Sequence, residues 1–188
     1  MSARARRLPA EEGLWVFVIA DMTVLAIFFN VFAYYRRLEP AIFQAGQATL
    51  ITFFGLVNTV ILLTSSWFMV LALRAVRSRE RRKVVTRIAM AVACGMAFSV
   101  LKIIEYAGKV AAGHTPLTND FYMLYFMFTG LHFLHLVIGM IALVALIGLA
   151  RKTEWNDAHV SYFESGAVYW HMVDLLWAVL FPLIYLIR

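Results

Sequence analysis

Cysteine and charged side chains are scarce in this sequence of 188 residues. The one cysteine, Cys94, lies in an apolar run, so the chain offers neither an internal disulfide nor a thiolate metal cluster. No C-x-x-C-H motif occurs, which excludes a covalently attached c-type haem. Charged residues make up 15% of the chain, too few to cover a water-soluble globular protein with polar side chains. A soluble globular fold is therefore excluded.

Apolar residues dominate instead: they account for 63% of the chain, and the mean hydropathy is +0.78. A helix needs about 20 mostly apolar residues to cross a bilayer, and five runs reach that length. They are Leu14–Tyr35, Thr49–Arg74, Thr86–Ala111, Tyr122–Ala150 and Tyr162–Ile187. The first run is longer than the apolar part of a signal peptide and lacks a small-residue cleavage site, so we expect it to be retained. The sequence thus predicts an all-α, polytopic membrane protein in which residues 1–188 form one bundle of five transmembrane helices.

The distribution of positive charge predicts the orientation of this bundle, because Lys and Arg in short loops stay on the cytoplasmic side of a membrane. The side that holds the amino terminus carries twelve Lys and Arg, and the other side carries four. We therefore predict a cytoplasmic amino terminus and a carboxyl terminus on the opposite side. The basic loop R-S-R-E-R-R-K is explained by this role and could also attract anionic lipid. Nucleic acid is not needed as a partner.

The last apolar run contains three polar side chains that fall on one face of a helix. Glu164 and His171 are seven residues apart and Asp174 follows three later, so at about 100° per residue all three lie within roughly 80° of arc. Ionisable side chains in a membrane helix usually face protein, water or a lipid headgroup. For Glu164 a second reading is open, because Ser161 and Glu164 have the S-x-x-E spacing of a capping box.

Further polar residues lie inside the other runs. His132 and His135 are three residues apart and share one face of the fourth run; they are either metal or haem ligands or neutral imidazoles hydrogen-bonded in the bundle. Lys102 and Glu105 have the same spacing, so they either form a local ion pair or have a functional role. Two more buried candidates stand in the first and second runs: Asp21, which either joins helices or carries a proton, and Asn58.

Two local patterns predict packing and a helix start. Ala89, Ala93 and Ala97 form a stripe of small residues along the third run, and such a stripe lets a neighbouring helix approach closely. Asn119 and Asp120 are typical of a helix start and stand just before the fourth run.

This inventory leaves three classes of function. A haem–copper catalytic subunit needs about six histidines in its helices, and the predicted spans hold only three, which are His132, His135 and His171. An intramembrane metal enzyme could draw its ligands from those three residues together with Glu164 and Asp174, which suit iron or zinc, but the repeated Glu-x-x-His pattern of di-iron bundles is missing. The third class is a non-catalytic subunit whose polar faces contact another subunit or enclose lipid.

Several ordered motifs carry a resemblance to one family. The segments T-G-L-H-F-L-H-L-V-I-G (129–139) and F-E-S-G-A-V-Y-W-H-M-V-D-L-L-W-A-V-L-F (163–181) resemble signatures of subunit III of the haem–copper cytochrome oxidases. L-V-N-T-V-I-L-L-T-S-S (56–66) and the Glu105-Tyr106 pair are similar to other family motifs in the same order. The segment 13–29 resembles a family helix that carries Glu where this chain has Asp21. The resemblance covers nearly the whole chain.

The resemblance implies a non-catalytic subunit III of the short five-helix bacterial form, placed in the inner membrane with its carboxyl terminus in the periplasm. Such a subunit has no cofactor of its own, packs against subunit I (and II), binds phospholipid, and helps to sustain proton uptake. The residues expected to form the buried polar network or to contact lipid or subunits are Asp21, Asn58, Glu105, His132, His135, Glu164, His171 and Asp174. Asp replaces Glu at position 21, and the segments 8–22 (L-P-A-E-E-G-L-W-V-F-V-I-A-D-M) and 165–186 (S-G-A-V-Y-W-H-M-V-D-L-L-W-A-V-L-F-P-L-I-Y-L) look more like the branch encoded with bacterial nitric oxide reductases. An accessory subunit of a nitric oxide reductase is therefore the alternative. The intramembrane metal enzyme is the second alternative.

Overall fold

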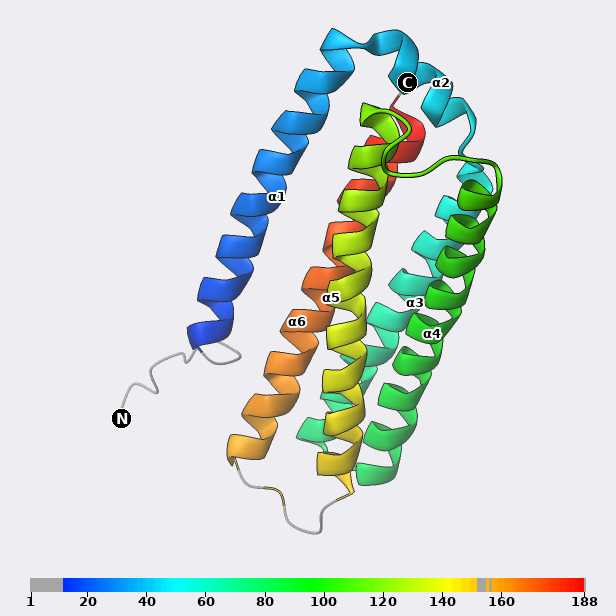
Figure 1. Cartoon of the computed structure of the whole chain (residues 1–188). Coiled ribbons are helices and arrows are strands. Elements are labelled where there is room, and N and C mark those ends of the chain that lie inside the picture. Colours follow the sequence, from blue (N-terminus) through cyan, green and yellow to red (C-terminus); the bar gives the residue numbers. More distant parts are fainter. Residues whose placement is uncertain (1–11, 152–154, 156, 188) are drawn as a thin grey trace.

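The structure is a computed structural model, which describes residues 12–151, 155 and 157–187 (Figure 1). Within this part of the chain all regular structure is helical. The elements are α1 (Glu12–Leu38), α2 (Pro40–Ala48), α3 (Thr52–Arg77), α4 (Arg81–Ala111), α5 (Asp120–Ala150), α6 (Asp157–Phe181) and the π-helical turn η1 (Pro182–Leu186). Five of these helices are long and apolar enough to cross a membrane. The predicted all-α fold with five spans is therefore confirmed.

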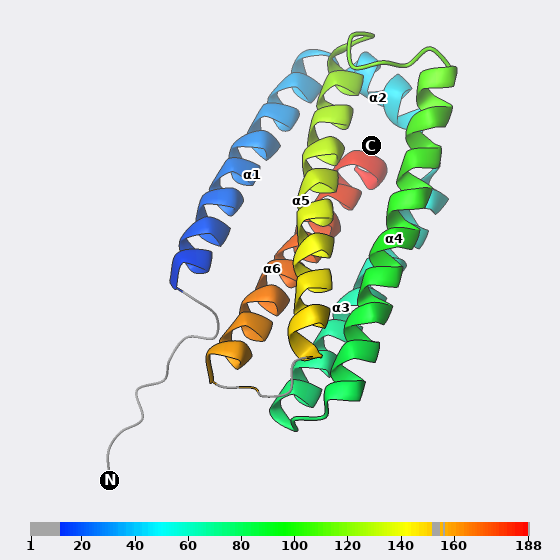
Figure 2. The same ribbon diagram turned by 60° about the horizontal axis from the view of Figure 1, so that its bottom comes forward.

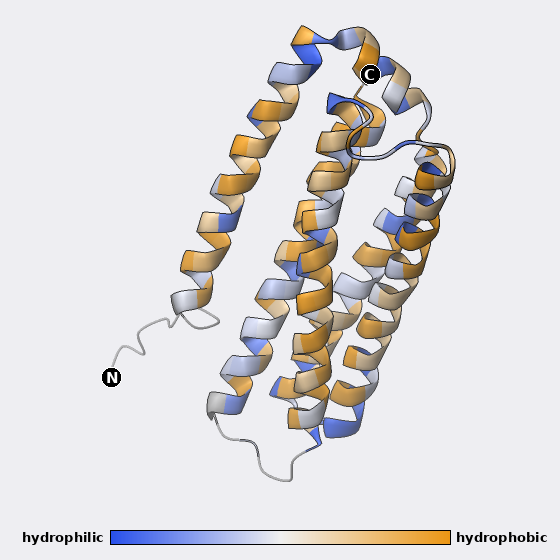
Figure 3. Cartoon of the chain, viewed as in Figure 1, coloured by the Kyte–Doolittle hydropathy of each residue, from blue (hydrophilic) through white to orange (hydrophobic). Residues whose placement is uncertain are grey.

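The four helices α3 to α6 form the bundle, in which α3 packs on α4 and α6, and α5 packs on α4 and α6. Helix α1 lies to one side of this bundle and contacts α2, α5 and α6 (Figures 1 and 2). Orange ribbon dominates the spans in Figure 3, while blue segments gather at their ends and at a few places inside the bundle.

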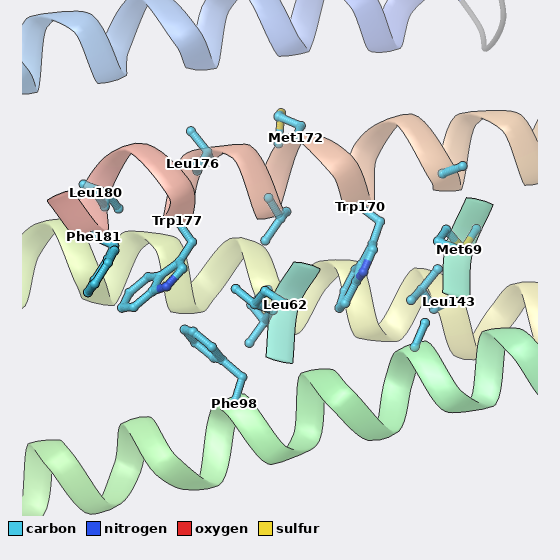
Figure 4. Close-up of a cluster of buried hydrophobic side chains, with 14 of the residues drawn as sticks. Leu62, Met69, Phe98, Leu143, Trp170, Met172, Leu176, Trp177, Leu180 and Phe181 are labelled. Carbon is cyan, nitrogen blue, oxygen red and sulfur yellow. The ribbon is translucent and has the colours of Figure 1, made fainter. Parts of the chain in front are cut away.

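Aromatic and aliphatic side chains fill the space between the four bundle helices (Figure 4). Trp170 and Trp177 of α6 point toward α3, α4 and α5, and are 0% and 1% exposed. Phe98 of α4 packs edge-on against Trp177, with ring centroids 4.9 Å apart. In lipid the hydrophobic effect does not drive helices together, so close packing of such large side chains contributes much of the cohesion.

The helix boundaries differ from the predicted runs in two places. A short helix, α2, precedes the second span and begins with Pro40, whose fixed φ suits the first helical position. Helix α6 begins at Asp157 rather than at Tyr162. Ser161 therefore lies inside the helix, and the predicted capping box of Ser161 and Glu164 is wrong.

Two smaller predictions have opposite outcomes. The predicted helix start at Asn119 and Asp120 is confirmed, because the Asn119 side chain accepts a hydrogen bond of 3.0 Å from the Tyr122 backbone N–H. The stripe of Ala89, Ala93 and Ala97 is exposed along its whole length, so the prediction that it packs against a neighbouring helix is wrong for the described chain. The buried small residues of α4, such as Ala91 and Gly95, lie on another face of this helix.

Candidate functional site

A buried ion pair joins α4 to α5 and η1. Lys102 Nζ lies 3.1 Å from Glu105 Oε2, and the two side chains are 1% and 7% exposed. The predicted pairing of these two residues is confirmed. Lys102 also donates to the hydroxyls of Tyr125 at 3.3 Å and Tyr185 at 3.0 Å. Both hydroxyls donate in turn to Glu105 Oε1, at 2.7 and 2.5 Å. The pair is therefore hydrogen-bonded on both sides, as a buried salt bridge requires.

Aromatic rings surround the ammonium group of Lys102. Its nitrogen lies 5.0 Å from the ring centroid of Tyr125, 5.1 Å from that of Trp177 and 5.3 Å from that of Tyr106, distances typical of cation–π contacts. Tyr106 extends the cluster by donating a hydrogen bond of 2.6 Å to Thr129, the first residue of the T-G-x-H motif. The charge of Lys102 is thus compensated within the chain by a carboxylate, two hydroxyls and ring faces.

A second group of polar contacts joins α6 to α3. The indole N–H of Trp170 donates to Ser65 Oγ at 3.0 Å, and that of Trp177 donates to Thr59 Oγ1 at 3.1 Å. His171 Nδ1 lies 2.6 Å from Ser66 Oγ. The predicted polar face of α6 thus turns toward α3. Glu164 of the same face lies 3.4 Å from the exposed Arg77 guanidinium at the end of α3.

Asp21 and His135 pair across the space between α1 and α5. Asp21 Oδ1 lies 3.4 Å from His135 Nε2, and His135 Nδ1 lies 3.0 Å from the carbonyl oxygen of Leu131. Tyr169 of α6 donates a hydrogen bond of 3.2 Å to the backbone carbonyl of His135. These contacts hold α1 near the bundle at the level of Asp21. An apolar cleft lies beside them, lined by Asp21, Leu25, Phe28, Phe128, His132 and Leu180, among others.

Three predicted site residues are buried without a hydrogen-bond partner among the described residues. They are Asn58, which is 0% exposed, His132, which is 2% exposed, and Asp174, which is 6% exposed. Asp174 Oδ2 lies 4.0 Å from His171 Nδ1, beyond hydrogen-bonding distance. His132 contacts the rings of Phe98 and Trp177, with centroids 5.5 and 5.2 Å away. Aromatic contacts, and not hydrogen bonds, therefore surround this imidazole.

The eight predicted site residues thus lie in separate places and do not form one connected network. Glu105 belongs to the lysine–tyrosine cluster, Asp21 and His135 to the α1–α5 contact, and Glu164, His171 and Asp174 to the α6 face toward α3. In the described part of the chain no three His, Cys, Asp or Glu side chains are arranged to hold a metal ion. The arrangement offers cross-links between helices, and their role in function stays a prediction.

Sequence reasoning missed the residues that complete these contacts. Tyr125 and Tyr185 lie 20 and 80 residues from Glu105, so no local spacing points to them. Gln47 is a further case: its amide donates to the carbonyls of Ile184, at 3.2 Å, and Ile187, at 2.9 Å, although these residues stand 137 and 140 positions later in the chain. For the contact between His171 and Ser66, the sequence shows only that a polar residue stands at position 66 of the second run.

Comparison with known proteins identifies relatives along most of the chain. The family model described as "Cytochrome c oxidase subunit III" matches residues 9–187. Cytochrome c oxidase subunit 3 of Synechocystis sp. is 29% identical over 177 residues, which cover 93% of this chain and 74% of that protein. The same subunit of Schizophyllum commune is 30% identical over 187 residues, covering 93% and 68%. A probable cytochrome c oxidase subunit 3 of Rickettsia bellii is 33% identical over 136 residues, covering 69% and 47%.

Proposed function

The chain belongs to the cytochrome c oxidase subunit III family, and we propose that it serves as the non-catalytic subunit III of a bacterial haem–copper terminal oxidase. The observation that carries this proposal is the match to the family model from residue 9 to residue 187, which spans every described helix. In this role the chain contacts subunits I and II and supports their assembly and their sustained proton uptake. It needs no cofactor of its own for this work.

The polar contacts inside the bundle are suited to a supporting role. Lys102 and Glu105 are paired with each other and with two tyrosines. Trp170, Trp177 and His171 each bond a hydroxyl of α3. Paired polar groups in a low-dielectric interior fix one geometry of the helices that carry them. A rigid bundle of this kind presents a fixed apolar surface to a neighbouring subunit.

Phospholipid is the second partner in this proposal. Val24, Leu25, Phe28 and Leu176 line the cleft beside Asp21 and give this surface an apolar character that suits contact with acyl chains, although the free volume of about 20 Å³ is too small to enclose one. The excess of Lys and Arg on the side of the amino terminus supports a cytoplasmic amino terminus and a periplasmic carboxyl terminus, in the inner membrane of a bacterium.

Extraction of the chain from its native membranes in mild detergent tests the proposal. We expect a larger, histidine-rich subunit that carries haem to co-purify with it, and the isolated chain to lack a Soret band. Recovery of the chain without any such subunit would contradict the proposal. Identification of the accompanying subunits by mass spectrometry also decides between an oxygen-reducing complex and the nitric oxide reductase suggested by Asp21.

A further inference from the structure

A groove with cations on one side and apolar side chains on the other lies between α3 and α4, close to the loop that joins them. Its cations are Arg82, Lys83 and Arg87, and its apolar wall is formed by Phe68, Leu71 and Met90. Among the described residues, no Asp or Glu lines it. None of the contacts described for the candidate site involves this groove.

Arg87 is held in the groove below the ends of the two helices. It stands six residues after Arg81, the first residue of α4, and is therefore about 9 Å along the helix axis. Its Nη1 donates a hydrogen bond of 2.6 Å to the carbonyl oxygen of Leu71, which stands six residues before the end of α3. Both residues are displaced from the helix ends by the same distance, about 9 Å, which for spans of 26 and 31 residues is close to the boundary between headgroups and acyl chains.

Arg82 and Arg87 have no carboxylate partner among the described residues, whereas two neighbouring cations do. Lys83 pairs with Glu80, and Arg77 pairs with Glu164. A cation at membrane depth without a counter-ion from the protein is costly, and such residues usually mark a binding site. A bound anion would supply to Arg87, and to the exposed Arg82 beside it, the negative charge that the described residues do not provide.

We propose that the α3–α4 groove binds the phosphate of an anionic phospholipid, with Arg82 and Arg87 as its ligands. Guanidinium groups bind phosphate oxygens through two parallel hydrogen bonds. The apolar wall then receives the first part of an acyl chain, and α3 carries further exposed apolar residues, such as Trp67 and Leu63, which are 63% and 57% exposed. The excess of cations over carboxylates in the groove selects an anionic headgroup over a zwitterionic one.

This site uses no residue of the internal polar contacts, so its test can fail while the proposed oxidase function stands. It also gives the basic loop a role in addition to setting orientation. Removal of two arginines leaves ten Lys and Arg on the side of the amino terminus against four on the other. The orientation of the chain in the membrane is therefore expected to persist in the variants below.

The test is lipid binding by the full chain, purified from its own membranes with any subunits that accompany it and then depleted of lipid by detergent washing. Native mass spectrometry measures the binding of palmitoyl-oleoyl phosphatidylglycerol and of the corresponding phosphatidylcholine. We expect phosphatidylglycerol to bind more tightly. Each arginine near an anionic headgroup contributes about fivefold to affinity, so R82Q should weaken phosphatidylglycerol binding about fivefold and R82Q/R87Q about 25-fold.

The matched control is R36Q/R37Q, which removes two arginines from the end of α1. It should leave phosphatidylglycerol binding unchanged. Loss of the hydrogen bond from Arg87 to Leu71 could impair folding of R82Q/R87Q. R82Q changes only an exposed side chain, so this single variant still tests the proposal in that case. Equal loss in the control, no loss in R82Q and R82Q/R87Q, or equal affinity for phosphatidylcholine would overturn the proposal. Displacement of the lipid by millimolar inorganic phosphate would also overturn it, because the groove would then be a site for a free anion.

Discussion

Lys102 and Glu105 are the residues at which a single change should cost the most stability. In E105Q the lysine ammonium stays buried without its carboxylate, and breaking a buried pair in this way costs about 3–5 kcal/mol. In K102M/E105Q neither charge remains, so most of that loss should be recovered. Thermal unfolding of the purified protein in detergent measures both effects.

The exposed pair of Lys83 and Glu80 provides the control for this cycle. Their side chains are 57% and 45% exposed, and surface pairs contribute less than about 1 kcal/mol. E80Q should therefore leave the melting temperature nearly unchanged. If K102M/E105Q were as unstable as E105Q, the burial of an unpaired charge would not be the cause.

Gly139 lies where α5 and α6 approach each other closely. A Cβ at this position would stand 2.9 Å from a ring carbon of Trp170. G139A should therefore destabilise the protein by about 1–3 kcal/mol, the usual cost of overpacking. G130A, on the same helix, is the control, because a Cβ there meets nothing within 4 Å. Thermal unfolding of the two variants should separate them, and equal stability would show that α5 and α6 are not so tightly packed.

For single residues, the sequence predicted contacts between residues that are close in the chain and missed contacts between residues that are far apart in it. Lys102 and Glu105 are three residues apart on one helix, so their spacing alone predicts the pair. Their tyrosine partners come from other helices, and only the packing of those helices brings them near. For the same reason, the sequence could place the polar face of α6 but could not show that it contacts Ser66 of α3.

At the scale of the elements, η1 depends on α2. Gln47 donates hydrogen bonds to two backbone carbonyls of the carboxyl-terminal segment, Ile184 and Ile187. In Q47A these carbonyls lose their donor, so the last residues should open more often. Hydrogen exchange followed by mass spectrometry should show faster exchange of the segment 182–187. Q44A removes an exposed glutamine of the same helix and should leave the exchange unchanged.

The orientation of the helices across the membrane can also be tested directly. In a C94S background, L117C places a thiol in the loop between α4 and α5, and S78C places one in the loop between α3 and α4. A membrane-impermeant maleimide should label L117C in intact cells, after the outer membrane is made permeable, and should label S78C only in lysed cells. The reverse pattern would contradict the orientation predicted from positive charge.

The five spans were predictable because twenty or more apolar residues in a row have few alternatives in a membrane. Helix ends were less predictable. α6 begins five residues earlier than expected, at Asp157, because polar residues can continue a helix beyond the apolar core of the bilayer. The short α2 was missed because its nine residues form no apolar run long enough to cross the membrane.

For the complete chain, we predict that polar contacts inside the bundle support a partner and do not carry out chemistry. His171, whose ring bonds Ser66 of α3, is a suitable residue for this test. H171A should lower the yield of assembled complex or shorten its active lifetime during turnover. Electron transfer in the complex that does assemble should persist. Complete loss of catalysis in an intact, fully haem-loaded complex would contradict this expectation.

The most direct test of the central claim is the absorbance spectrum and metal content of the chain before and after it is separated from the complex in which it is extracted. We predict that the haem Soret band and the metal remain with a larger, histidine-rich subunit and that the separated chain retains neither. A folded, separated chain that keeps a stoichiometric haem, iron or copper would contradict the claim.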